Sequence, residues 1–202
     1  YTKSFFLLRQ RKNFHLKKAV FTGFTNLKIV TVSNWQKKEV EKTFLRKYDI
    51  TQIYNGLDFK NLEQFLNVEK KENMILGTNT YWNEEKGLED FIELSKVLPK
   101  QYKIVLAGLS DKQIKTLPKN IEGLKLIENH RELMTLYAQS SLFLNLSVSE
   151  TMGMTTVEAL ACGSPTIVYD KTAVPEIINE KVGQVVKAKD INGLLLAIKN
   201  VT

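Results

Sequence analysis

Between residues 74 and 200, short buried-type strands alternate with amphipathic helices, and this alternation limits the fold more than any other feature. Residues 103–108 contain the apolar run Ile104-Val105-Leu106-Ala107, which is typical of a strand buried on both faces. A helix is predicted from about Lys86 to Leu98, between this strand and one over 74–77. Strands joined by such helices form βαβ units. We therefore expect an α/β fold with a Rossmann-like, doubly wound parallel sheet.

The whole chain divides into three predicted parts. Residues 1–58 read as a partial Rossmann-like unit, 59–72 as a linker, and 73–202 as a second domain. In the first part we predict helices over 4–24 and 34–45, with Ser33 as an N-cap, and strands over 27–32 and 50–54. In the second domain, over 73–202, further strands are predicted over 121–127, 142–146, 166–169 and 183–186, and further helices over 129–139, 152–161, 175–179 and 191–200.

The net charge of +7 is concentrated in the first part of the chain. Residues 1–50 hold 12 Lys and Arg against 3 Asp and Glu, whereas residues 51–202 hold 17 against 19. Such a segment is either a solvated helix surface or a contact for an anionic membrane, a nucleic acid or an acidic partner.

Composition excludes several classes of protein. No apolar run approaches the roughly 18 residues of a membrane-spanning helix. One cysteine, Cys162, excludes a disulfide framework, and with only two histidines a His/Cys metal site is not expected. The start at Tyr1, with scattered charges, predicts no signal peptide and indicates a fragment.

The most informative segment follows the strand over 142–146, where ligands bind in sheets of this kind. Glu150 lies in the loop, and Gly153 at the helix start lets a ligand approach the backbone. The free amides of Gly153, Met154 and Thr155 would suit a phosphate. Glu158, in an apolar setting, could accept hydrogen bonds from a ribose diol. The alternative is that Glu150 caps the helix and Glu158 pairs with a lysine.

Neither a G-x-G-x-x-G nor a G-x-x-x-x-G-K-[ST] motif is present, which argues against a standard dinucleotide site and a Walker-type ATPase. Instead, Glu150 to Pro165 resembles the E-x7-E signature of retaining GT-B glycosyltransferases of glycosyltransferase family 4. Four further motifs resemble that family in the same order: Ser33-Asn34-Trp35, Asn55-Gly56-Leu57-Asp58, Lys86-Gly87-Leu88 and Pro175-Glu176-Ile177-Ile178.

The resemblance implies a role for each matching residue. Glu150 would contact hydroxyls of the donor sugar, Glu158 would bind the ribose, and Lys86 would neutralise the leaving diphosphate. Lys86 lies at a predicted helix N-terminus, where a cation is unfavourable beside the positive end of the helix dipole, and a bound anion would offset this repulsion. The alternative is that Lys86 is an ordinary solvated lysine. Gly108 would admit the nucleotide backbone, and Ile127 would contact the base or pack in the core.

The implied function is sugar transfer, with retention, from a UDP-, GDP- or ADP-linked donor to a saccharide or lipid-linked acceptor. Bacterial surface polysaccharide synthesis is the implied setting. No metal or other cofactor and no nucleic acid partner is expected. The implied location is cytoplasmic, at the inner face of the membrane where residues 1–50 would contact it.

The sequence also departs from the family. No arginine lies near Lys86, Met152 replaces a common phenylalanine, and Ala173-Val174 replaces the usual Gly-Gly. From the resemblance we expect most of an N-terminal domain and the last C-terminal helices to lie outside residues 1–202, and this chain to bind donor nucleotide without transferring sugar.

Other readings remain at this point. An epimerase on the same fold would lack the E-x7-E arrangement, and a pyridoxal-type phosphorylase would need a longer chain. A non-catalytic nucleotide-sugar-binding domain is compatible with the missing arginine. A basic module for membrane or nucleic acid is the third alternative.

Overall fold

The computed structural model describes residues 2–58 and 62–201 of the chain. The chain forms two compact units, Tyr1–Tyr54 and Asn55–Thr202. The segment Asn55-Gly56-Leu57-Asp58 therefore groups with the second unit. Of the predicted linker over 59–72, residues 59–61 lie outside the described residues. Its remainder contains a 3-10 turn, η3 (Glu63–Phe65), and the start of a strand at Lys71.

The first unit is a small α/β arrangement. Its two strands pair in parallel, with Ile29 beside Ile50. The hydroxyl of Ser33 accepts from the backbone N–H of Gln36 at 3.1 Å, so Ser33 is the N-cap that its position predicted. The elements are α1 (Thr2–Thr22), β1 (Lys28–Thr31), α2 (Asn34–Glu41), the 3-10 turn η1 (Phe44–Lys47) and β2 (Asp49–Gln52).

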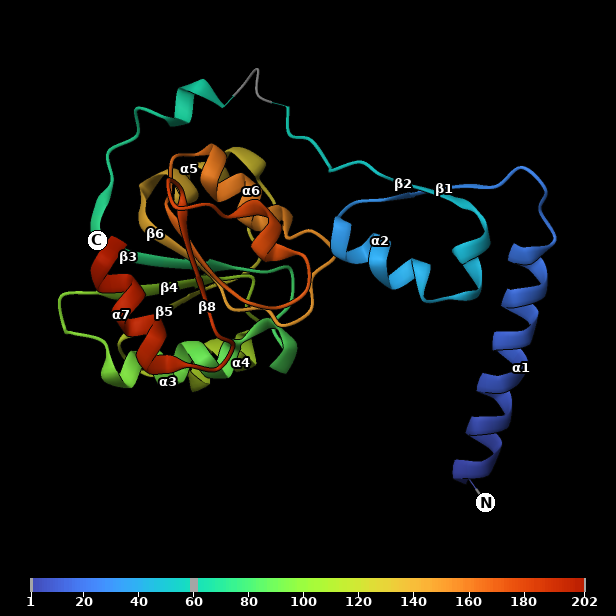
Figure 1. Cartoon of the computed structure of the whole chain (residues 1–202). Coiled ribbons are helices and arrows are strands. Elements are labelled where there is room, and N and C mark those ends of the chain that lie inside the picture. The colour runs from blue at the N-terminus through green and yellow to red at the C-terminus, as the bar shows by residue number, and fades with distance from the viewer. Residues whose placement is uncertain (1, 59–61, 202) are drawn as a thin grey trace. The chain divides into compact units, whose positions relative to one another are not determined.

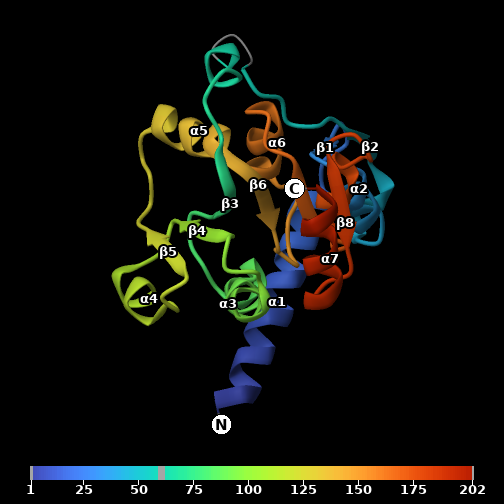
Figure 2. The ribbon, with the colours of Figure 1, turned by 90° about the vertical axis from the view of Figure 1, so that its left-hand side faces the viewer.

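The second unit is built on a six-stranded sheet in which every neighbouring pair is parallel. The strand order is β5-β4-β3-β6-β7-β8, and Figure 2 shows it from β5 on the left to β8 on the right. The order reverses between β3 and β6, which confirms the doubly wound topology. The strands are β3 (Lys71–Thr78), β4 (Lys103–Ala107), β5 (Ile121–Leu124), β6 (Ser140–Asn145), β7 (Thr166–Tyr169) and β8 (Gly183–Val186).

Helices cover both faces of this sheet. Figure 1 shows α5 and α6 on one face and α3, α4 and α7 on the other. Within the described residues, no helix is long and apolar enough to cross a bilayer. The helical elements are the 3-10 turn η4 (Glu84–Lys86), α3 (Leu88–Val97), α4 (Asp111–Thr116), α5 (His130–Gln139), α6 (Met154–Ala161), the 3-10 turn η5 (Val174–Ile177) and α7 (Ile191–Val201).

Because both faces are covered, successive strand residues enter opposite core clusters. In β3, Ile75 packs into the cluster beneath α3 and α7, while Met74 and Leu76 pack into the cluster beneath α5 and α6. All three side chains are buried. This explains why the strands are continuous apolar runs rather than alternating ones.

Several predicted elements have different bounds in the structure. The helix predicted from Lys86 begins at Leu88, because Gly87 takes a left-handed conformation with φ 77° between η4 and α3. The strand predicted to reach Ile127 ends at Leu124, where the carbonyl of Leu124 turns to accept from the amides of Gly108 and Leu109. Ile127 consequently lies half-buried in the loop before α5.

The short helix α4 was not predicted. It begins with a capping box, in which the hydroxyl of Ser110 accepts from the amide of Gln113 and the side chain of Gln113 accepts from the amide of Ser110. This S-x-x-Q pattern was the available sequence signal. α4 packs against the edge strand β5.

Candidate active site

The candidate site lies at the carboxyl ends of β3 and β6, the two strands between which the sheet order reverses. Loops that leave such a switch point diverge to opposite faces, and the crevice between them is where open α/β sheets bind ligands. The hollow here has a volume of about 220 Å³. It is lined by Asn55, Asn79, Thr80, Tyr81, Lys86, Glu150, Thr151, Met152, Gly153, Met154 and Thr155.

Lys86 and Glu150 form an ion pair in this hollow. The ammonium of Lys86 donates to Glu150 Oε1 at 2.6 Å, and the two side chains are only 13% and 18% exposed. The ring of Tyr81 lies 5.9 Å from the same ammonium. Lys86 is therefore neither solvated nor paired with its sequence neighbours, and Glu150 faces the hollow instead of capping α6.

The backbone around Lys86 explains how it reaches this position. The side chain of Asn83 accepts from the amide of Lys86 at 3.0 Å and starts η4. A Cβ on Gly87 would lie 2.5 Å from the carbonyl oxygen of Leu146, so only glycine permits this approach of the two loops.

A main-chain clasp joins the loops that follow β3 and β6. The carbonyl of Glu85 accepts from the amide of Val148 at 2.8 Å and from the hydroxyl of Ser147 at 3.2 Å. On the other side, the hydroxyl of Thr172 accepts from the amide of Glu150 at 3.0 Å. The clasp holds Lys86 and Glu150 opposite one another although they are far apart in the sequence.

The start of α6 forms another wall. Gly153 is the N-cap with φ 85°, and Met154 and Thr155 are the first two helical residues. Below them, the side-chain amide of Asn145 donates to the hydroxyl of Thr156 at 2.9 Å and ties the helix to the end of β6. The first amides of a helix lack intrahelical acceptors, so this wall suits an anion.

Glu158 lies one turn further along α6, outside the lining of the hollow. It is half-buried, and Tyr137 donates to its Oε2 at 3.2 Å. Burial raises the pKa of Glu158, while the Tyr137 hydrogen bond and the charge of His130 partly oppose that rise. The partner of Glu158 is therefore a tyrosine and not a lysine.

Gly108 is explained by packing. Its φ is 94°, and a Cβ there would lie 1.6 Å from the carbonyl oxygen of Asn79. The close approach that requires glycine is thus made by the loop after β3. Contacts of Gly108 and of Ile127 with a nucleotide stay predictions.

Residues 58–202 match the family described as Glycosyl transferases group 1. The chain belongs to this family. It is similar to the O-antigen chain mannosyltransferase RfbU of Salmonella typhimurium, at 27% identity over 183 residues that cover 86% of this chain and 50% of the relative.

Solved structures show the GT-B fold of such glycosyltransferases. Sucrose-phosphate synthase from Thermosynechococcus elongatus has a TM-score of 0.74 at 21% identity and covers 95% of this chain and 52% of that protein. Alr3699/HepE from Anabaena, solved in complex with UDP and glucose, has a TM-score of 0.70 at 20% identity. The match covers 94% of this chain and 57% of that protein. This glycosyltransferase chain thus spans about half the length of these three proteins.

The residues that the sequence analysis missed lie mostly in the loop after β3. Asn79, Thr80 and Tyr81 line the hollow of this glycosyltransferase chain. Their position at the end of a central strand was a usable signal, although nothing in their identity indicated a site. Asn55 was seen only as part of a motif. Its backbone amide donates to Met152 Sδ at 3.2 Å.

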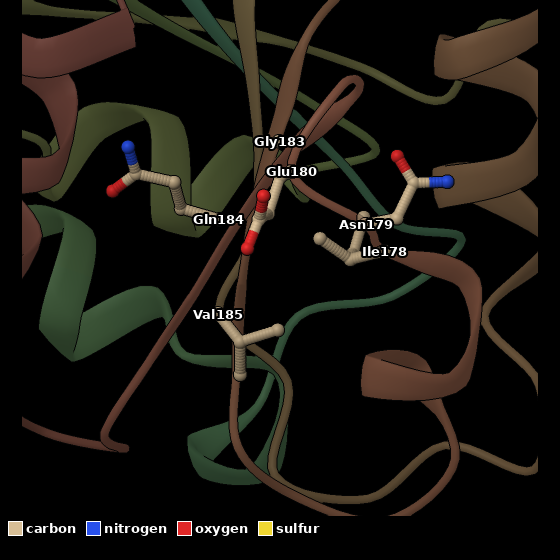
Figure 3. Close-up of a pocket in the computed structure, with 6 residues that line it drawn as sticks. All are labelled: Ile178, Asn179, Glu180, Gly183, Gln184 and Val185. Atoms are coloured by element: carbon tan, nitrogen blue, oxygen red, sulfur yellow. The ribbon is translucent and has the colours of Figure 1, made fainter.

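A second hollow, of about 440 Å³, lies along the edge strand β8 (Figure 3). The side chains of Asn179 and Gln184 point to opposite sides there, with Glu180 between them. A carboxylate without a cation among the lining residues repels an anion, so this hollow suits an anionic ligand less well than the one at β3 and β6. Its lining consists of Ile178, Asn179, Glu180, Gly183, Gln184 and Val185.

Proposed function

We propose that this chain is the donor-binding part of a retaining GT-B glycosyltransferase of family 4. The observation that carries the proposal is the largely buried Lys86–Glu150 pair, which shares one hollow with the first amides of α6 at the switch point of the sheet. A cation and free amides together suit a diphosphate, and a carboxylate beside them suits sugar hydroxyls. The UDP complex of the Anabaena neighbour supports a nucleotide sugar as ligand.

Each residue then has a role in the transfer. The bond between the anomeric carbon and the diphosphate oxygen breaks, and the acceptor oxygen bonds to the same face of that carbon. The acceptor proton passes to the leaving diphosphate. Lys86 and the amides of Gly153, Met154 and Thr155 stabilise the negative charge that develops on the diphosphate, without a metal ion. Glu158 holds the ribose, and Glu150 holds the sugar.

The ion pair also implies an exchange on binding. In the free site the ammonium of Lys86 is neutralised by Glu150. A diphosphate carries more charge than one carboxylate, so it draws Lys86 toward itself and frees Glu150 for the sugar hydroxyls. Binding and sugar recognition are coupled in this way.

The acceptor is proposed to be a saccharide or a lipid-linked sugar of a bacterial surface polysaccharide. The mannosyltransferase relative, which acts on the O-antigen chain, supports this class of acceptor. Because the chain covers about half of its relatives, we propose that residues 1–202 alone bind the donor nucleotide, and that transfer needs the part of the enzyme that binds the acceptor.

Calorimetric titration of the chain with UDP, GDP and ADP tests the donor site. We expect one of the three to bind and Glu158→Ala to weaken that binding about tenfold, because hydrogen bonds to a charged group are lost. The matched control is Glu132→Ala, which replaces an exposed glutamate in the first turn of α5. This variant should bind like the wild type. Absence of binding by all three nucleotides would contradict the proposal.

We also propose that the basic first part contacts an anionic membrane. The side chains of residues 11–20 are exposed, and they mix lysine and arginine with Phe14, Leu16 and Val20. Such a surface gains both charge attraction and apolar burial at a lipid headgroup region.

Sedimentation with vesicles tests this contact. Phosphatidylglycerol vesicles should carry the chain down, and added salt should release it, whereas phosphatidylcholine vesicles should not. Equal sedimentation with both lipids would argue against the proposal. Salt-sensitive binding to a DNA duplex without vesicle binding would favour a nucleic acid partner instead.

A further inference from the structure

Tyr137 is fully buried, yet its hydroxyl contacts two polar side chains from two different elements. It lies 2.7 Å from Thr78 Oγ1, at the end of β3, and 3.2 Å from Glu158 Oε2, on α6. Its ring packs edge-on against Phe143 of β6, with ring centroids 5.4 Å apart. The hydroxyl is thus fixed in space by a ring that cannot turn away.

The direction of these hydrogen bonds follows from the chemistry of the groups. An ionised carboxylate only accepts, so the proton of Tyr137 is donated to Glu158. The hydroxyl has one proton, so Thr78 must donate to the oxygen of Tyr137. Burial raises the pKa of Tyr137 well above its ordinary value, and the phenol stays protonated. The result is a one-way chain from Thr78 through Tyr137 to Glu158.

This series of hydrogen bonds constrains where the carboxylate of Glu158 points. Within the described part of the molecule, the side chain of Glu158 makes one hydrogen bond, and it accepts that bond from Tyr137. It uses one acceptor position on Oε2, and a carboxylate has about four such positions. The remaining positions are left for a ligand, and the bond from Tyr137 opposes rotation of the carboxylate away from them.

We propose that Tyr137 is a positioning residue that, with Thr78 behind it, aims the carboxylate of Glu158 at the ribose hydroxyls of the donor nucleotide. This inference rests on the proposed role of Glu158 in ribose binding. Tyr137 itself does not touch the nucleotide. It acts by fixing the rotamer of Glu158 and by favouring its ionised form, in which both carboxylate oxygens accept and neither donates, as the two hydroxyls of a diol require.

The test measures discrimination between a ribonucleoside diphosphate and its 2′-deoxy analogue, as the ratio of their dissociation constants. The ratio isolates the contact between Glu158 and ribose, because contributions from the diphosphate and from Lys86 cancel. The wild type should prefer the ribonucleotide about tenfold at pH 7, and Tyr137→Phe should reduce that preference several-fold. Thr78→Val should reduce it less, because the direct bond to Glu158 survives.

The pH dependence of the same ratio separates positioning from a purely structural role. Among the described residues, the titratable groups that act on Glu158 are Tyr137 and His130 on α5 and Cys162, the C-cap residue of α6. Burial raises the pKa of Cys162 to about 11, so the thiol stays neutral. As pH falls through the pKa of Glu158, the ratio should approach one. Tyr137→Phe removes a bond that lowers this pKa, so the loss should occur at higher pH than in the wild type.

Tyr169→Phe is the matched control. Tyr169 is equally buried but belongs to the core cluster on the other face of the sheet. The Tyr169→Phe variant should leave both the ratio of dissociation constants and its pH dependence unchanged. Urea unfolding checks that each variant is folded, and Thr78→Val decides the question if Tyr137→Phe does not fold.

Two outcomes would overturn the inference in distinguishable ways. If the wild type discriminates but Tyr137→Phe and Thr78→Val discriminate equally well with the same pH dependence, Tyr137 has no positioning role. If the wild type binds both nucleotides equally, the ribose contact of Glu158 fails, and the proposed role of Tyr137 fails with it.

Discussion

Lys86→Met is expected to weaken binding of the preferred nucleoside diphosphate about 100-fold. The ammonium is nearly buried and donates to Glu150 at 2.6 Å, so its removal deletes a charge-assisted contact to the diphosphate, worth roughly 1.5–3 kcal/mol. It also leaves the carboxylate of Glu150 facing the anion, which adds repulsion. Calorimetry on the folded variant measures the loss.

Two further variants make this prediction specific. Lys96→Met removes a lysine that also pairs at 2.6 Å, with Glu93, but both side chains are more than half exposed, and binding should not change. Lys86→Met combined with Glu150→Gln should recover part of the affinity, because the uncompensated carboxylate is gone. Wild-type affinity in Lys86→Met would show that the diphosphate binds elsewhere.

Gly108→Ala is expected to destabilise the second unit by roughly 3–5 kcal/mol. An added Cβ would lie 1.6 Å from the carbonyl oxygen of Asn79, and the φ of 94° is itself unfavourable for alanine. Trp82 reports on this region, because its indole N–H donates to the carbonyl of Ala107 at 2.9 Å. Urea unfolding followed by Trp82 fluorescence, in a Trp35→Phe background, measures the effect.

Gly56→Ala is the control for this substitution. An added Cβ at Gly56 meets nothing within 4 Å, so the free energy of unfolding should stay within about 0.5 kcal/mol of the wild type. Equal unfolding midpoints for the two alanine variants would show that the loops after β3 and β4 do not approach as closely as described.

Much of the fold could be predicted because its signals are local. The strands over 166–169 and 183–186 match the structure residue for residue, since short apolar runs between turns have one reading in an α/β alternation. Helix boundaries were harder. The helix expected from Lys86 starts later because Gly87 turns left-handed, and that turn depends on the loop after β6.

The candidate site could be predicted in part. The family motifs identified Lys86, Glu150 and the start of α6, and the structure places them around one hollow. They did not indicate that Lys86 and Glu150 pair, because that contact depends on the parallel pairing of β3 with β6. The hydrogen bond from Tyr137 to Glu158 was equally hidden, since a tyrosine on the apolar face of a helix reads as core.

The main-chain clasp between the loops has a consequence for how such a site can change over evolutionary time. The acceptor is the backbone carbonyl of Glu85, and any amino acid at this position would supply the same carbonyl. Substitutions at this position can therefore accumulate without opening the crevice. Neighbouring side chains that line the hollow, such as Tyr81, are free to diversify on a frame that their replacement does not disturb. A laboratory search for altered donor preference would begin with those side chains and leave Gly87 untouched.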